Sequence, residues 1–335
     1  MTIDVPDAPA QDQVDRDAGI EIFETLQAIT ELIFDLEHRY VREVGRKNVG
    51  LPDLKRLAAH LRKTTDYAKQ IYELASLSGV IVLADGRWQL SLGAENWLSW
   101  TPDQRFSHLA KTWRLILGDA SARELQAGFE KQHGVISLDQ QLKLTYPFAD
   151  GSVSSKIAKL ENLAALIGLG AAGWMSSWTK TVLASDFKTA GNDASAKLPT
   201  PQRRLICQAD LSLIAPGPLP TDVEIMIRRF ADTEQIGMAS TYRLSALSIS
   251  HGLETGLDIS SIRTLLEDLS EKSLPQPIEY LINEAEKRFA RLQIVEAGEG
   301  DRRPHRGGDV RLRLRRQRGR LPPHGRQLGP RPARA

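Results

Sequence analysis

Cysteine is almost absent from this chain of 335 residues, in which Cys207 is the only one. No disulfide and no cysteine metal cluster can therefore form within the chain. Because Cys207 lies in a short apolar segment, we expect a small core residue rather than a catalytic thiol. The seven histidines are scattered without the spacing of metal ligands. The sequence thus predicts no metal site and no cofactor.

Long hydrophobic runs and phosphate-binding loops are also missing. Every apolar run is far shorter than the roughly 18 residues that suggest a membrane-spanning helix. The acidic start MTIDVPDAPAQDQVD has no hydrophobic signal core, so we expect a cytoplasmic protein without membrane contact. The G-x-x-x-x-G-K-[ST] loop that holds ATP and magnesium in motor enzymes does not occur. We predict that the chain is not an enzyme and has no helicase motor.

One glycine-rich string is open to two interpretations. Residues 168–173, GLGAAG, match the G-x-G-x-x-G pattern of dinucleotide-binding folds. Such a fold needs a preceding strand and a series of βαβ units. Here the preceding residues instead carry Ile157, Leu160, Ala164 and Ile167 at helical spacing. We favour the end of a helix and a turn over a nucleotide site.

Charge is distributed unevenly along the chain. Residues 302–335 contain twelve arginines, no lysine and one acidic residue, which leaves 32 of the 44 basic and 41 of the 42 acidic residues for the rest. The body is therefore acidic. The tail is rich in proline and glycine and lacks helical or strand periodicity, so we expect it to be disordered. Two explanations stay open: an arginine-rich arm that binds nucleic acid, or translation out of frame near Asp301 in a GC-rich gene.

Three apolar stripes at helical spacing, followed by a hairpin, organise the N-terminal part. The stripes are Ile22, Leu26, Ile29, Ile33, Leu36 and Tyr40; Leu54, Leu57, Ala58 and Leu61; and Tyr67, Ile71 and Leu74. The first predicts a helix over residues 20–43, either packed in a core or paired in a coiled coil. Asp85-Gly86 predicts a hairpin turn ahead of an alternating strand. Helix, helix and hairpin in this order are typical of a winged helix, and Trp97, Trp100 and Trp113 are expected to lie in the core of the helices that follow.

A winged helix contacts DNA through the second helix of its tandem pair, yet the outward residues expected there, Asp66, Lys69, Gln70 and Glu73, carry little positive charge. The other basic residues of this part offer contacts to phosphate that read no base sequence. The full set of candidate DNA-binding residues is Arg46, Lys47, Lys55, Arg56, Arg62, Lys63, Lys69 and Arg87. The alternative is that these residues are solvated charges on a helical surface.

Residues 205–294 hold the most ordered succession of structural signals. LICQADLSLIA predicts one buried strand, closed by a proline-rich turn. Thr221 and Glu224 have the spacing of a capping box at the start of an amphipathic helix. Residues 236–243 alternate as a half-buried strand does. Ser245 and Asp258 are expected to be the N-caps of two further helices.

A last helix follows Pro275 and Pro277, since proline is tolerated in a first helical turn. These signals together indicate a compact α+β module. The block resembles the helicase-associated module found in the N-terminal part of bacterial XPB-type helicases and in stand-alone bacterial proteins that lack the motor. Four segments carry the likeness in order: QADLS, IAPGPLP, STYRLS and LPQPIEYLINEAEKRFARLQI. The chain departs from the family at Ala290, where glycine is usual.

We therefore predict a helix-dominated α+β protein. Its expected parts are a disordered N-terminus at 1–19, a winged-helix-like domain at 20–118, a helical or second winged-helix-like unit at 119–200, the helicase-associated module at 201–296 and the arginine-rich tail at 297–335. The resemblance implies a DNA-associated accessory role in DNA repair or genome maintenance, with DNA and a helicase or another protein as partners. The alternative is an interaction or transcription-regulating protein with no direct link to a helicase, consistent with an acidic body that nucleic acid would repel.

Overall fold

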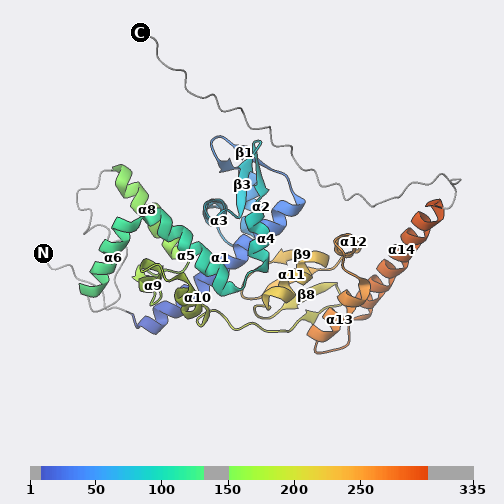
Figure 1. Cartoon of the computed structure of the whole chain (residues 1–335). Helices are drawn as coiled ribbons and strands as arrows, with labels where there is room; N and C mark the ends of the chain where they lie inside the picture. The colour runs from blue at the N-terminus through green and yellow to red at the C-terminus, as the bar shows by residue number, and fades with distance from the viewer. Residues whose placement is uncertain (1–8, 132–150, 301–335) are drawn as a thin grey trace, which may run out of the picture. The chain divides into compact units, whose positions relative to one another are not determined.

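The structure is a computed structural model that describes residues 9–131 and 151–300 (Figure 1). Helices dominate, and short antiparallel strands form three small sheets among these residues, which confirms the predicted helix-dominated α+β class. The described residues up to Phe289 belong to one compact unit, and those from Ala290 onward belong to a second. None of the described helices is both long enough and apolar enough to cross a membrane. The tail after Asp301, with its two explanations, lies outside the described residues.

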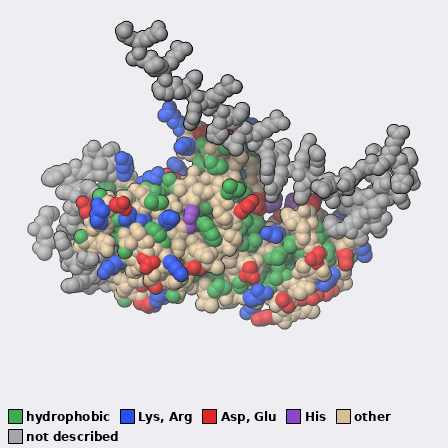
Figure 2. All heavy atoms as spheres, viewed as in Figure 1, with side chains coloured by type: hydrophobic (Ala, Val, Ile, Leu, Met, Phe, Trp, Pro, Cys, Tyr) green, Lys and Arg blue, Asp and Glu red, His purple; other side chains and the backbone are tan. Residues whose placement is uncertain are grey.

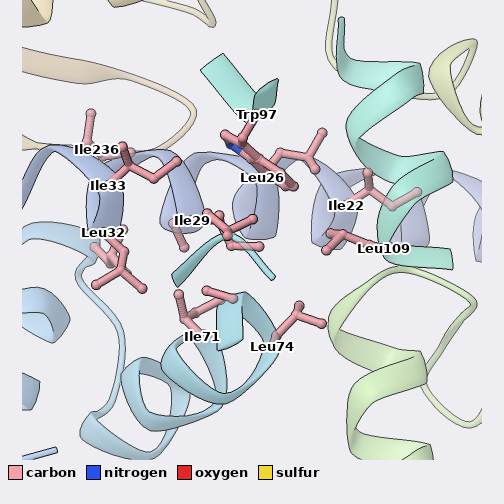
Figure 3. Packing of buried hydrophobic residues seen from close by; sticks show 14 of the residues in the cluster. Ile22, Leu26, Ile29, Leu32, Ile33, Ile71, Leu74, Trp97, Leu109 and Ile236 are labelled. Carbon is pink, nitrogen blue, oxygen red and sulfur yellow. The ribbon is translucent and has the colours of Figure 1, made fainter. Parts of the chain in front are cut away.

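The helix α1 (Gln11–His38) forms the centre of the N-terminal packing. Its stripe from Ile22 to Leu36 is buried within the chain, as expected for a core helix rather than an exposed coiled-coil seam. Figure 3 shows that the neighbours of α1 come from several sides. They are Ile71 and Leu74 below the helix, Trp97 above it, Leu109 near its N-terminal half, and Ile236 beside Ile33.

The limits of α1 differ from the prediction at both ends. The helix begins at Gln11, so residues 11–19 are helical where a disordered N-terminus was expected, and Val14 and Ala18 are buried. It ends at His38 instead of continuing to residue 43. Tyr40, which was assigned to the apolar stripe, therefore lies outside the helix and is 56% exposed.

A four-stranded sheet and two helices follow α1. The elements are β1 (Val41–Val44), β2 (Asn48–Val49), α2 (Leu51–Leu61), α3 (Thr65–Leu77), β3 (Ile81–Ala84) and β4 (Arg87–Leu90), with strand order β2-β1-β4-β3. The tandem helices and the hairpin at Asp85-Gly86 are confirmed, and both turn residues have the positive φ that such a tight turn requires. The strands β1 and β2 were not predicted.

The middle of the chain is helical. It contains α4 (Leu92–Ser99), α5 (Pro102–Leu117), α6 (Asp119–Lys131), α8 (Gly151–Leu166), β5 (Gly170–Ala171), β6 (Trp174–Met175), α9 (Thr179–Leu183) and α10 (Phe187–Ser195). Trp97 and Trp113 are fully buried as predicted, whereas Trp100 is only partly buried. The GLGAAG string is a helix end and a two-stranded hairpin, because α8 stops at Leu166 and β5 pairs antiparallel with β6. This agrees with the favoured interpretation and disagrees with a dinucleotide site.

The segment that follows contains a second four-stranded sheet and four helices. Its elements are β7 (Ile206–Cys207), β8 (Ser212–Ala215), α11 (Thr221–Phe230), β9 (Asp232–Gln235), β10 (Ser240–Arg243), α12 (Ala246–Glu254), α13 (Ile259–Leu269) and α14 (Gln276–Gly300), with strand order β7-β8-β10-β9. Ser245 and Asp258 are the N-caps of α12 and α13, as predicted. Pro277 lies in the first turn of α14, also as predicted.

Three details of this segment were predicted wrongly. The single strand expected over LICQADLSLIA is a hairpin of β7 and β8, whose turn contains Leu211 at φ +71°. The strand expected over residues 236–243 is shorter, because only Ser240–Arg243 forms β10 and the residues before it turn back from β9. The capping box at Thr221 is absent, since the N-cap is Pro220 and no side chain caps the helix.

Candidate nucleic-acid interface

The eight predicted DNA-binding residues occupy four places in the N-terminal fold. Arg46 and Lys47 lie in the turn between β1 and β2; Lys55, Arg56, Arg62 and Lys63 lie on α2 or directly after it; and Lys69 and Arg87 lie on α3 and at the start of β4. These residues differ in whether their charged groups are already paired with a carboxylate or are available to contact a phosphate. Two of them are bound to carboxylates, and the others form no ion pair with any described residue.

Arg56 is the more firmly held of the two. Its Nε and Nη2 donate to the two carboxylate oxygens of Asp35 at 3.0 and 2.9 Å, and its Nη1 donates to Asp53 at 2.8 Å. The hydrogen bond with Asp35 raises the pKa of Arg56 further. Lys63 Nζ lies 2.5 Å from Glu24 Oε2 and also near the ring of Tyr67. Phosphate would have to displace these carboxylates, so Arg56 and Lys63 are poor anion contacts.

The helix α3 is also poorly placed to read DNA. Its Glu73 pairs with Lys159 of α8, so a neighbouring helix lies beside the outward side of α3. A shallow pocket next to Gln70 is lined in part by Asp17 and Glu21 of α1. Carboxylates beside this helix repel phosphate. Lys69 is exposed, but its surroundings do not form a basic recognition face.

A cluster that was not predicted lies on the first sheet. Arg42 of β1 is directly opposite Arg87 of β4, and both guanidinium groups lie over the ring of Tyr40, at 5.5 and 4.9 Å from its centroid. All three side chains are exposed. Figure 2 shows Lys and Arg side chains at the upper edge of the surface, where Figure 1 draws the β1 hairpin. Arg42 and Tyr40 were missed because Tyr40 was assigned to the preceding helix; Gly45 is the one turn signal in the sequence at this place.

A second unpredicted feature is a buried charge network. Arg228 of α11 is only 1% exposed and donates to Glu31 of α1 at 2.5 Å and to Glu224 at 2.6 Å. His60 of α2 completes the network, with its Nδ1 2.8 Å from the other oxygen of Glu31. The backbone N–H of Ile236 also donates to the carbonyl oxygen of His60 at 3.0 Å. These contacts join α1 and α2 to the segment that begins at β7.

The ionisation of these groups is mutually dependent. Burial opposes the charge of Glu31, but the hydrogen bond with His60 and the charge of Arg228 outweigh burial and lower the pKa of Glu31. Burial also opposes the charge of Arg228, and Glu224 and Glu31 outweigh it, so the pKa of Arg228 is raised. The hydrogen bond with Glu31 raises the pKa of His60 from its ordinary value of 6.5. The network is therefore fully charged when His60 is protonated.

We expect the His60 contact to make stability depend on pH. A raised folded-state pKa means that the contribution of His60 is complete below pH 6.5 and is lost as the pH rises through the raised value. His60→Asn places a non-titrating N–H near the position of Nδ1. In urea unfolding, the stability difference between wild type and H60N should therefore shrink as the pH rises from 6 to 9. An equal difference at both pH values would contradict this role for His60.

Other chemistry is limited in the described residues. No group of three or more His, Cys, Asp or Glu side chains is arranged to hold a metal ion in the parts of the chain that the structure describes. Cys207 is partly buried against the core, and burial raises the pKa of its thiol. A raised pKa lowers the thiolate fraction, so this side chain has the properties of a core residue and not of a nucleophile.

Comparison with known proteins relates part of the chain to a described family. Residues 205–302 match the family model described as helicase conserved C-terminal domain. The match covers less than a third of the chain and begins at the residue before β7. It links this segment to helicase-associated domains in general. No curated protein is similar enough to the chain to count as a match.

Proposed function

We propose that the protein is a nonenzymatic, DNA-associated accessory module related to the N-terminal region of XPB-type helicases, acting with or beside a helicase in DNA repair or genome maintenance. The observation that carries this proposal is the helicase-type match over residues 205–302. The sequence supports the nonenzymatic part, because it contains no phosphate loop of the Walker type. The resemblance of the segment to the XPB-associated module supplies the finer assignment.

The N-terminal fold supports the DNA-associated part of the proposal. Its order of α1, β1, α2, α3, β3 and β4, with the short β2 between β1 and α2, supports the proposal of a winged helix in which the Asp85-Gly86 hairpin is the wing. The usual recognition helix would be α3, which is flanked by α8 and by carboxylates. We therefore propose that this domain contacts the phosphate backbone through its sheet and turns and does not read bases through α3.

Binding of the full chain to a fluorescent duplex and to a single strand, at 50 and 200 mM salt, tests this function. We expect micromolar or weaker affinity that falls as salt rises, because phosphate contacts release counterions. A full-length control in which the twelve arginines of residues 302–335 become glutamine isolates the body from the tail. We also expect no ATP turnover above a blank, with or without DNA. Absence of binding by this control at 50 mM salt would contradict a DNA-associated body.

The alternative is a winged-helix protein that docks other proteins. The pairing of Arg56 and Lys63 with carboxylates favours it, because two of the eight predicted DNA contacts are already neutralised within the chain. The acidic composition of residues 1–301 points the same way. Under this alternative the body would bind neither duplex nor single strand at low salt.

A further inference from the structure

The sheet of the N-terminal fold presents two arginines in an arrangement that is unfavourable unless an anion is present. Arg42 and Arg87 are a directly opposed cross-strand pair, and like charges in such a pair repel each other. Neither guanidinium forms an ion pair with a described carboxylate, and both side chains are exposed. An exposed, unneutralised pair of this kind is suited to an anionic partner that spans both groups.

Tyr40 holds the two guanidinium groups near each other. Both groups lie over the same ring, at 5.5 Å for Arg42 and 4.9 Å for Arg87, so their carbon atoms are within about 10 Å of each other. Side chains alternate along a strand, so Tyr40 and Arg42 lie on one face of the sheet while Val41 and Trp88 lie buried on the other. The ring thus restricts two long cationic side chains before any ligand binds.

Two further cations lie at the same end of the sheet. β1 runs antiparallel to β4, and Glu43 N donates to the carbonyl oxygen of Gly86. The β1–β2 turn, with Arg46 and Lys47, therefore lies at the same end as the turn between β3 and β4. The acids near these turns are Glu43, whose carboxylate accepts from the backbone N–H of Lys47, and Asp85. This end of the sheet therefore carries four cationic and two acidic side chains, which leaves it with an excess of positive charge.

We propose that Arg42, Arg87, Arg46 and Lys47 form the contact surface for the phosphate backbone of nucleic acid, with Tyr40 as the positioning residue for the arginine pair. This rests on the proposed DNA association and names the surface that provides it. A strand of B-form DNA rises about 3.4 Å per phosphate, so two guanidinium groups no more than about 10 Å apart span at most about three phosphate steps and can contact the same strand. The contact is independent of base sequence, because guanidinium–phosphate bonds read no base edge.

The first test compares two double variants of the full chain in which the tail arginines are glutamine. Arg42→Ala with Arg87→Ala removes the pair, while Lys111→Ala with Lys180→Ala removes the same charge from exposed positions on α5 and α9. On a mixed-sequence duplex we expect the first variant to bind roughly tenfold more weakly at 100 mM salt. The slope of the logarithm of its binding constant against the logarithm of salt concentration should correspond to about two fewer phosphate contacts. The Lys111/Lys180 variant should retain the affinity of the parent chain with the glutamine tail.

The second test addresses Tyr40. Tyr40→Phe keeps the ring face over which the guanidinium groups lie and should bind like wild type. Tyr40→Ala removes the ring and should weaken binding about threefold with an unchanged salt slope, because the two arginines remain but must be ordered on binding. Equal losses for both Tyr40 variants, or no loss for either, would overturn the positioning role. Circular dichroism and thermal unfolding confirm that each variant is folded.

The outcomes separate this inference from the proposed function. If the body binds DNA and the R42A/R87A variant binds no more weakly than the K111A/K180A variant, the surface is wrong while DNA association stands. If the body binds neither duplex nor single strand, the DNA association and this surface both fail. A single strand bound more tightly than the duplex, with the same loss in R42A/R87A, still supports the phosphate contact and identifies the preferred form.

Discussion

Arg228→Ala should lower the free energy of unfolding by about 3–5 kcal/mol. The substitution leaves Glu31 and Glu224 without their shared cation, and both carboxylates are almost completely buried. Removing one member of a buried charge network costs far more than an exposed ion pair contributes, because the remaining charges keep their desolvation penalty. Urea unfolding at pH 7 measures the change.

Arg204→Ala is the matched control. Arg204 pairs with Glu271 at 3.0 Å, but both side chains are well exposed, so the loss should be under about 1 kcal/mol. A triple variant, Arg228→Met with Glu31→Gln and Glu224→Gln, should recover much of the stability lost in R228A, since it removes the uncompensated charges. If R228A unfolds at the same urea concentration as R204A, the network does not stabilise the fold as described.

Gly168→Ala should produce the second large effect. Gly168 has φ +65°, and a Cβ at this position would meet the side chain of Ile22 and the carbonyl oxygen of Ala18, both in the buried part of α1. Left-handed backbone costs a residue with a side chain about 1–2 kcal/mol. Forcing a methyl group into packed surroundings costs about 1–3 kcal/mol more. We therefore expect a loss of about 2–5 kcal/mol in urea unfolding.

Gly79→Ala separates these two contributions. Gly79 has a similar φ of +73°, but a Cβ there would meet nothing within 4 Å. Its substitution should lower the free energy of unfolding only by the cost of the left-handed backbone conformation, about 1–2 kcal/mol. Equal losses in G79A and G168A would mean that the contact with α1 is unimportant. This comparison also bears on the GLGAAG string, because the carbonyl oxygen of Gly168 accepts from Ser176 and from the indole of Trp178, which gives this glycine a structural role.

Features that depend on neighbouring residues could be predicted from the sequence. The apolar stripes of α2 and α3, the turn at Asp85-Gly86 and the N-caps Ser245 and Asp258 each depend on residues a few positions apart. The hairpin of β7 and β8 could not be predicted in this way. Its turn places a leucine, Leu211, in the left-handed region, where glycine or asparagine would have been the expected signal.

The candidate site was predicted only in part for a similar reason. Arg46, Lys47 and Arg87 lie at the end of the sheet that carries the proposed phosphate contact, but Arg42 and Tyr40 were missed because Tyr40 fits the helical stripe of α1 by spacing alone. Arg56 and Lys63 were chosen as free cations. One partner of Arg56, Asp53, lies three residues away on α2, a spacing that indicates a helical ion pair. The other partners, Asp35 for Arg56 and Glu24 for Lys63, lie 21 and 39 residues away. Sequence spacing gives no access to pairings at such separations.

The bond from Arg228 to Glu31 spans 197 positions of the chain. One of the two carboxylates that neutralise Arg228 in the helicase-like segment therefore comes from α1, outside that segment. Transplanting the segment into another host would leave Arg228 with Glu224 as its remaining carboxylate partner, unless the recipient supplied an acid at the position of Glu31. A substitution at Glu31 therefore acts on α11 as directly as a substitution within the segment itself.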